Sequence, residues 1–163
     1  MGRFPGFVRA LFSGTPRVSR APRVSRAPAA ATATVQVDPR SVADVRLGYA
    51  PKADSRPDPG EIVWTWVPYE ENDGRGKDRP VLIVSRLTSS TCLGVALTSK
   101  SHEGDRGSVA IGSGAWDRSG RASWARIDRL FCVHDRGMRR EGSALDARTY
   151  AVVAQAIRAR YRW

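Results

Sequence analysis

Two short stretches of the sequence carry side chains that are suited to gripping a phosphodiester. Arg79 follows residues 72–78, which are rich in glycine and charge, and it directly precedes the apolar residues 80–84. A guanidinium held at the end of a buried strand can donate two parallel hydrogen bonds to a phosphate. Arg126 and Asp128 alternate along a second strand, so they lie on one face, about 7 Å apart at Cα, and can flank one phosphate.

Charged and hydroxyl side chains of this kind could act on a phosphodiester, and one such reaction is the cleavage of RNA without a metal ion. In that reaction the 2′-OH attacks the neighbouring phosphorus, so the protein must remove the hydroxyl proton, stabilise the phosphorane and allow the 5′ oxygen to leave with a proton. The two histidines, His102 and His134, stand alone in the sequence and are expected to be surface residues rather than catalysts. No CxxC or Cys/His spacing typical of metal sites occurs, so no metal ion and no cofactor are expected.

Short strands are the elements expected to position these residues. Residues 61–67 alternate, with Ile62, Trp64 and Trp66 on one face and Val63, Thr65 and Val67 on the other. Residues 81–84 form an unbroken apolar run, typical of a strand buried on both faces. Pro80 lacks a backbone donor and is therefore expected at the first position of that strand.

Further strands are predicted at residues 91–98, 108–111, 122–128 and 130–133, and a helix at about 142–161. The helix is expected to begin with a capping box formed by Ser143 and Asp146. The sequence therefore predicts a mainly β fold, a small SH3-like barrel of five to six strands with a C-terminal helix.

The first third of the chain has a different composition. The hexapeptide of residues 17–22 is repeated as residues 23–28, and an Ala/Thr-rich run follows. Such a segment cannot bury a core, so residues 1–56 are expected to be a disordered basic N-terminal extension, with at most a short docking element within residues 35–50. A single domain is predicted for residues 57–163.

The charge and the apolar content of the chain limit the kinds of partner that can be expected for it. Of the formal net charge of +11, most lies in residues 1–56, which hold ten Lys/Arg against three Asp/Glu. A basic balance favours polyanions without specifying an activity. No apolar run approaches the roughly 20 residues needed to span a bilayer, and no signal peptide is recognisable, so a cytoplasmic protein without a membrane partner is expected. Cys92 and Cys132 are expected as reduced thiols, unless neighbouring strands bring them into bonding geometry.

Three motifs in fixed order resemble the PemK/MazF family of toxins from bacterial toxin–antitoxin pairs. They are Gly-Glu-Ile-Val-Trp at 60–64, Arg-Pro-Val-Leu-Ile-Val-Ser at 79–85 and Leu-Thr-Ser-Lys at 97–100, and the resemblance spans about residues 58–162. It implies a small SH3-like barrel and the activity of a metal-free endoribonuclease, which would cut single-stranded RNA through a 2′,3′-cyclic phosphate. It also implies a homodimer and a cognate antitoxin chain.

The resemblance also implies roles for individual residues. Arg79 would stabilise the phosphorane, and the Thr98 hydroxyl would contact the scissile phosphate. Arg126-Ile-Asp128 is similar to the Arg-x-Asp of the Kid/PemK branch, so Asp128 would take the 2′-OH proton while Arg126 supplies positive charge. After Asp128 the usual Gln-apolar-Arg-Thr of the family is replaced by Arg129-Leu-Phe-Cys.

Five further residues are candidates for holding the RNA. The backbone contacts are assigned to Arg75, Lys77, Ser99 and Lys100, and Trp124 is placed to stack on a base, a contact worth about 1–3 kcal/mol. Each has an ordinary alternative, because charged loops are usually solvated and a tryptophan can simply pack over the end of a barrel.

Two other functions stay open on the sequence. A non-catalytic RNA- or DNA-binding barrel would have Arg126 and Asp128 merely ion-paired with each other. A toxin that targets DNA gyrase, similar to CcdB, would use the aromatic C-terminus that ends in Trp163.

Overall fold

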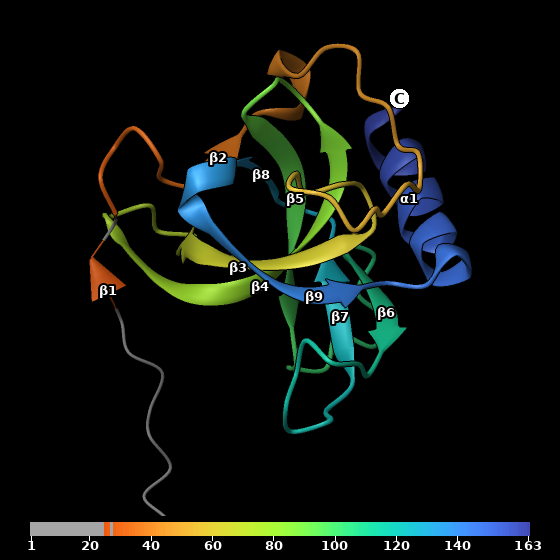
Figure 1. Cartoon of the computed structure of the whole chain (residues 1–163). Helices are drawn as coiled ribbons and strands as arrows, with labels where there is room; N and C mark the ends of the chain where they lie inside the picture. The colour runs from red at the N-terminus through yellow and green to blue at the C-terminus, as the bar shows by residue number, and fades with distance from the viewer. Residues whose placement is uncertain (1–24, 27) are drawn as a thin grey trace, which may run out of the picture.

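Antiparallel strands form one strongly curved sheet in the computed structural model of the chain, which describes residues 25, 26 and 28–163 (Figure 1). The strands are β1 (Ser25–Arg26), β2 (Val35–Val37), β3 (Glu61–Pro68), β4 (Arg75–Arg86), β5 (Thr91–Thr98), β6 (Ser108–Gly112), β7 (Ser123–Arg126), β8 (Leu130–His134) and β9 (Met138–Ala144). Two 3-10 turns, η1 (Pro39–Ser41) and η2 (Asp135–Gly137), and the helix α1 (Ala147–Tyr161) complete the described elements. The strand order is β2-β8-β5-β4-β3-β9, with β1 beside β4 and β7 between β5 and β6.

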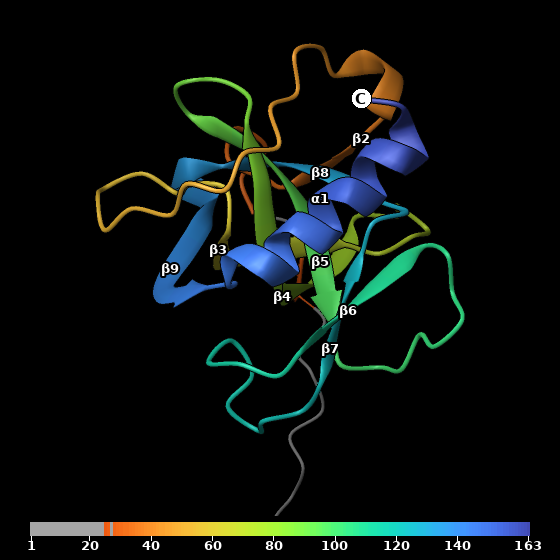
Figure 2. The same ribbon diagram turned by 90° about the vertical axis from the view of Figure 1, so that its right-hand side faces the viewer.

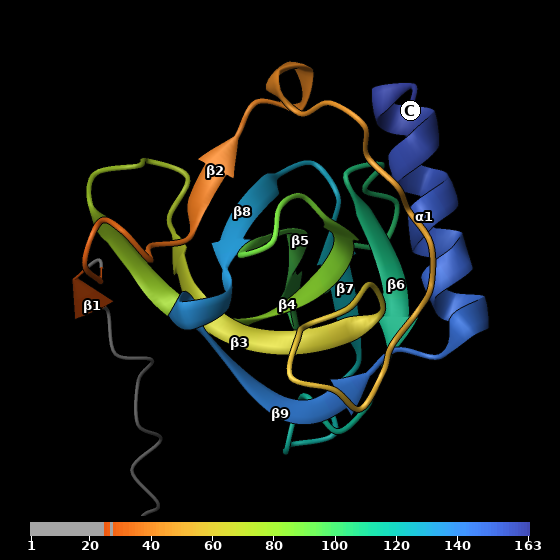
Figure 3. The ribbon, with the colours of Figure 1, turned by 45° about the horizontal axis from the view of Figure 1, so that its top comes forward.

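The strand β4 is buried on both faces, as its apolar run predicts. Val81 and Ile83 belong to a buried cluster with Phe131 of β8, here called the inner cluster. Figure 3 shows the strong curvature of β3 and β4. Leu82 and Val84 belong to a larger cluster on the opposite face. The helix α1 lies along that second face and covers it (Figure 2). The sheet therefore carries two separate cores, and β4 contributes to both.

The prediction of a mainly β fold with a C-terminal helix is confirmed, and strands occur at all six predicted places, although the curved sheet does not close into a complete barrel. Three strands are added to them, namely β1, β2 and β9. The most consequential is β9, which pairs with β3 from Glu61↔Ala144 to Thr65↔Met138. Its sequence, Met-Arg-Arg-Glu-Gly-Ser-Ala, shows no apolar alternation, because most of its side chains are exposed.

The start of β4 differs from the prediction. The strand begins at Arg75, so Pro80 and Arg79 lie inside it rather than at its end. Pro80 is tolerated there because the pairing of β4 with β5 begins only at Val81, so Pro80 lies just outside that ladder. The polar residues 75–79 thus extend a hairpin with β3 instead of forming a loose loop.

The predicted helix start at Ser143 is wrong. Ser143 lies in β9, and the helix begins after Asp146, whose side chain accepts a hydrogen bond of 2.9 Å from the Thr149 amide. The helix buries Tyr150, whose hydroxyl donates to the Val84 carbonyl oxygen at 2.8 Å. Burial raises the pKa of Tyr150 to about 12, so this hydrogen bond persists through the neutral range.

Residues upstream of the predicted boundary at 57 also pack on the sheet. Strand β2 pairs with β8, the Thr34 and Thr65 hydroxyls are hydrogen-bonded at 2.8 Å in a buried position, and Leu47 enters the core under α1. The order of these residues differs from the disorder expected for 1–56, while residues 1–24 and 27 lie outside the described part. The division into an extension and a domain at residue 57 stays a prediction.

Both cysteines are free thiols. Cys92 is buried and Cys132 is half-buried, and they lie on neighbouring strands without sharing a paired position. Burial raises the pKa of Cys92 to about 12, which keeps its thiol protonated and unreactive at neutral pH. None of the helices in the described residues has the length and apolarity needed to cross a membrane.

Candidate active site

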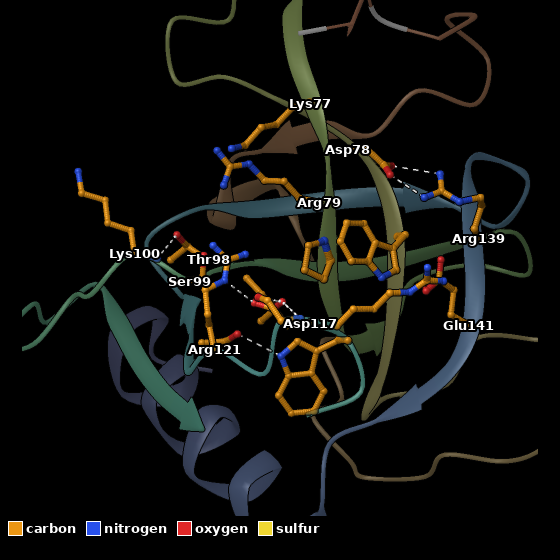
Figure 4. Close-up of a pocket in the computed structure, with 17 residues that line it drawn as sticks. Lys77, Asp78, Arg79, Thr98, Ser99, Lys100, Asp117, Arg121, Arg139 and Glu141 are labelled. Atoms are coloured by element: carbon orange, nitrogen blue, oxygen red, sulfur yellow. Dashed lines mark hydrogen bonds and ion pairs between the residues drawn. The ribbon is translucent and has the colours of Figure 1, made fainter. Parts of the chain in front are cut away.

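The residue around which the site is built is Arg79, in the middle of β4. Val81 pairs with Ala96 of β5, and continuing this register by two residues places Arg79 opposite Thr98 at the end of β5. Figure 4 shows the side chains of Arg79 and Lys77 leaving β4 toward the side on which Thr98 and Lys100 lie. The side chain of Arg79 is half-buried, and no hydrogen bond or ion pair joins its guanidinium to any described residue. Its guanidinium is therefore available to an external anion.

Two hollows meet at this point. The larger hollow, of about 800 Å³, is lined by Lys77 and Ser99 among others, and the smaller hollow, of about 510 Å³, by Arg126 and Arg129 among others. The residues that line both are Arg79, Leu97, Thr98 and Lys100. The predicted pair of Arg79 and Thr98 thus forms the ridge between two cavities, where an extended chain could pass from one to the other.

The charged forms of the cations at and beside this ridge are disfavoured. Burial lowers the pKa of Arg79, and the nearby charges of Arg129 and Arg126 lower it further. Burial and the charge of Arg79 likewise lower the pKa of Lys77, and burial lowers that of Arg129. Because lowered pKa values mean that the charged forms are disfavoured, a bound anion would relieve the repulsion.

Arg126 and Asp128 are brought together, but they bind each other. The Arg126 Nε donates to Asp128 Oδ1 at 3.0 Å and its Nη2 to Asp128 Oδ2 at 2.6 Å, while Nη2 also reaches Glu70 Oε1 at 3.1 Å. These hydrogen bonds raise the pKa of Arg126, with Asp128 contributing most. Arg126 lines the smaller hollow, whereas Asp128 lines neither. Asp128 therefore orients Arg126 in this structure and has both oxygens occupied.

Arg129 and its support were not predicted as part of the site. Its Nε and Nη2 donate to Gln36 Oε1 at 3.0 and 2.9 Å, and Nη2 also donates to the Pro68 carbonyl oxygen at 3.1 Å. Its guanidinium carbon lies 4.9 Å from the centre of the Phe131 ring. The signal for it was the departure from the family pattern directly after Asp128. Gln36 lies 93 residues away in the chain, and no local pattern could connect the two.

The remaining predicted residues are divided between the cavities. Lys77 and Ser99 line the larger hollow, Lys100 lines both, and Arg75 lines the smaller one. Arg75 is exposed and held by Asp73 at 2.7 Å, so its charge is partly compensated. Trp124 lines neither hollow, although its position pairs with Thr98 across β5 and β7. The base-stacking role predicted for Trp124 gains no geometric support.

The far wall of the larger hollow is made of paired charges and indoles. Asp78 binds Arg139 at 2.6 Å and Asp117 binds Arg121 at 3.0 Å, as the dashed lines of Figure 4 mark. The buried indole nitrogen of Trp64 has no hydrogen-bond partner among the described residues. Arg139 and Arg121 of this wall thus have carboxylate partners, whereas Arg79 has none among the described residues. Nowhere in the described residues do three or more His, Cys, Asp or Glu side chains form a group that could hold a metal ion.

The aromatic C-terminus is used for packing. The Tyr161 hydroxyl donates to the Ile127 carbonyl oxygen at 2.6 Å, and the rings of Tyr161 and Trp163 lie 5.2 Å apart beside the core under α1. Trp163 is partly buried as a result. These contacts give the terminal tryptophan a structural role within the chain.

Comparison with known proteins follows the same part of the chain. The profile of a family described as PemK-like, MazF-like toxins of type II toxin–antitoxin systems matches residues 58–160. A search of curated proteins gave no match. Among solved structures, MazF from Deinococcus radiodurans (Form-I) is 18% identical, with 66% of this chain and 97% of that chain covered and a TM-score of 0.52. MazE–MazF from the same organism (Form-II) is 18% identical, with coverage of 63% and 93% and a TM-score of 0.48. The likeness to the first structure concerns the fold.

Proposed function

Since the chain belongs to the family of PemK-like and MazF-like toxins of type II toxin–antitoxin systems, we propose that it is an endoribonuclease. It would cut single-stranded RNA in the cytoplasm without a metal ion and leave a 2′,3′-cyclic phosphate. The proposal includes a cognate antitoxin chain, as the family description states for such systems, and a homodimer as the assembly.

The observation that carries the proposal is the position of Arg79. It is a half-buried arginine with no protein partner among the described residues, at the ridge between two hollows and opposite the Thr98 hydroxyl. A structural arginine at such a depth would normally have a carboxylate or carbonyl partner. An arginine kept free at a ridge is instead suited to an incoming phosphate.

The geometry supports a separate role for each of these residues during cleavage. Arg79 would donate to the non-bridging oxygens of the scissile phosphate and stabilise the charge that develops on the phosphorane. Thr98 would hydrogen-bond the same phosphate, and Arg126, fixed by Asp128, would add positive charge from the smaller hollow. The nucleotides on either side of this phosphate would lie in the two hollows.

A second function, a non-catalytic nucleic-acid-binding module, is favoured by one specific observation. A non-catalytic module is expected to contain an ion pair such as that of Arg126 and Asp128. Both oxygens of Asp128 are engaged in this pair, so the carboxylate is poorly placed to accept a proton from a substrate. Such a module would bind RNA at the same ridge and release it uncut.

One experiment separates the two functions. The purified chain is incubated with a defined single-stranded RNA in EDTA, and the ends of the products are determined. An endoribonuclease of the proposed kind gives fragments with 5′-OH and 2′,3′-cyclic phosphate ends. Intact RNA that comigrates with the protein would support the binding module, and intact RNA without binding would contradict both.

A bound polyanion is also expected to stabilise the fold. The lowered pKa of Lys77 means that its charged form destabilises the folded state. This destabilisation is fully present below the folded-state pKa and disappears as the pH rises through the ordinary pKa of lysine. Binding that offsets such costs adds about 2.7 kcal/mol at a hundredfold excess over Kd, which corresponds to a rise in Tm of about 5–10 °C for a chain of this size.

The rise in Tm is measured by thermal unfolding at pH 7 with and without a short oligodeoxynucleotide, which cannot undergo attack by a 2′-OH. Arg40→Ala removes a side chain that is 93% exposed and should leave the rise unchanged. Arg79→Ala should reduce it clearly. An equal rise in all three proteins would show that the anion binds elsewhere.

A further inference from the structure

The loop between β5 and β6 places a histidine in the smaller hollow. His102 lies in residues 99–107, its side chain is only 18% exposed, and it lines the same cavity as Arg79, Thr98 and Arg126. The sequence predicted a surface residue without a catalytic role. In the structure the imidazole is mostly covered and lines the smaller hollow together with Arg79 and Thr98, which the scissile phosphate would contact.

Asp105 holds this imidazole in one orientation. The His102 Nδ1 lies 3.1 Å from Asp105 Oδ2, and Asp105 Oδ1 accepts a hydrogen bond of 2.8 Å from the Gly107 amide. The Gly107 hydrogen bond is the largest cause of the lowered pKa of Asp105, and the hydrogen bond with His102 lowers it further. Because an ionised carboxylate at Nδ1 keeps the proton of the neutral ring on that nitrogen, the lone pair is left on Nε2. No described residue is hydrogen-bonded to Nε2.

The reaction needs a proton acceptor, and two residues that were predicted to act on the substrate, Asp128 and Thr98, do not fit this role. Asp128 accepts two hydrogen bonds from Arg126 and does not line either cavity. The Thr98 hydroxyl is a neutral group, and its oxygen already accepts a hydrogen bond of 3.2 Å from the Lys100 amide. A neutral imidazole with a free nitrogen is the kind of base that suits a reaction near neutral pH.

We propose that His102, oriented by Asp105, is the general base of RNA cleavage in this chain. This inference rests on the proposed function. His102 Nε2 takes the proton of the 2′-OH, the 2′ oxygen forms a bond to phosphorus, and the bond from phosphorus to the 5′ oxygen breaks. The leaving 5′ oxygen takes a proton from water, and Asp105 stabilises the imidazolium until it releases its proton to solvent. Asp105 is a positioning residue, because it acts on the substrate only through His102.

The charges around His102 are mostly positive. Apart from Asp105, the charged groups that line its hollow are the carboxylates Glu70 and Glu71 and the cations Arg75, Arg79, Lys100, Arg126 and Arg129. A neutral imidazole is the form that accepts a proton. The same cations bind the phosphate, so binding and proton removal occur in one cavity.

The test compares single-turnover cleavage by the full chain and by His102→Gln, Asp105→Asn and the matched control His134→Gln. His134 lies at the end of β8, outside both hollows. For His102→Gln, the cleavage rate should fall by about 10²–10⁴-fold, while the Kd for the same RNA with a 2′-deoxy substitution at the cleavage site stays unchanged. In the parent protein, the rate should fall about tenfold per pH unit on the acid side of the histidine pKa. This acid limb should be absent in His102→Gln and displaced in Asp105→Asn, and His134→Gln should match the parent.

Several results would overturn the inference. If the parent cuts RNA and His102→Gln cuts it at the same rate, another group removes the proton. The same conclusion follows if the rate of His102→Gln still falls on the acid side. A loss of RNA binding without a change in the single-turnover rate would assign His102 to binding instead. The parent profile tests the idea even if a variant fails to fold, because a parent without an acid limb in the histidine range contradicts it. A parent protein that cuts no RNA would refute the proposed function itself, which is a separate outcome.

Discussion

Replacement of Arg79 by alanine is expected to lower the rate of RNA cleavage by about 100- to 1,000-fold, the usual effect of removing one group that stabilises developing charge. The guanidinium is the half-buried cation at the ridge between the hollows and is left without a hydrogen-bond or ion-pair partner in the described chain. Because it holds no other side chain in place, its loss should leave the fold intact and hardly change Tm. Arg79→Lys should recover only part of the rate, since an ammonium cannot donate the two parallel hydrogen bonds of a guanidinium.

The measurement is a single-turnover cleavage rate together with a thermal unfolding curve for each variant. Arg40→Ala is the matched control, because it removes the same charge from a side chain that is 93% exposed and outside both hollows. Its rate should equal that of the parent. A folded Arg79→Ala protein that cuts RNA as fast as the parent would contradict the proposed active site.

Replacement of Phe131 by alanine is expected to lower the free energy of unfolding by about 3–5 kcal/mol. The ring is fully buried in the inner cluster, lines the smaller hollow and supports the guanidinium of Arg129. A loss of this size is a large share of the roughly 5–15 kcal/mol that stabilises an ordinary domain. Cleavage should fall as well, because the floor of the hollow and the support of Arg129 are removed together.

Urea denaturation gives the free energy of unfolding for each variant. Phe131→Leu keeps part of the volume and should cost clearly less than the alanine variant. Val152→Ala on α1 removes methyl groups from a side chain that is 52% exposed and should stay within about 0.5 kcal/mol of the parent. If Phe131→Ala were as stable as the parent, the inner cluster would not be the support of the site.

Local pattern predicted the strands that are buried on both faces. The run at residues 81–84 can be recognised because burial on both sides excludes every polar residue. Strand β9 could not be recognised in this way, since its exposed residues owe their conformation to pairing with β3, more than 70 residues upstream. The helix start was misplaced by a similar effect, because Ser143 has the chemistry of a cap but is held in β9 by that pairing.

The same distinction between local patterns and long-range contacts applies to the site. The adjacency of Arg79 and Thr98 could be expected, because motifs on consecutive antiparallel strands meet across the sheet. The contacts that decide how the site works connect distant segments, such as Glu70 with Arg126 and Gln36 with Arg129. His102 was dismissed because a lone histidine in a polar loop is usually solvated, and only the path of the loop turns it toward the hollow.

The account depends on a protein that holds a phosphodiester while the RNA attacks itself. The most direct test compares two oligonucleotides that differ in one atom, an RNA that the chain cuts and the same RNA with a 2′-deoxy nucleotide at the cleavage position, both in EDTA. The account predicts that the RNA is cut to a 2′,3′-cyclic phosphate, while the substituted strand is bound with similar affinity and stays intact at that position. Cleavage of the substituted strand at the same bond, or cleavage that EDTA abolishes, would contradict it.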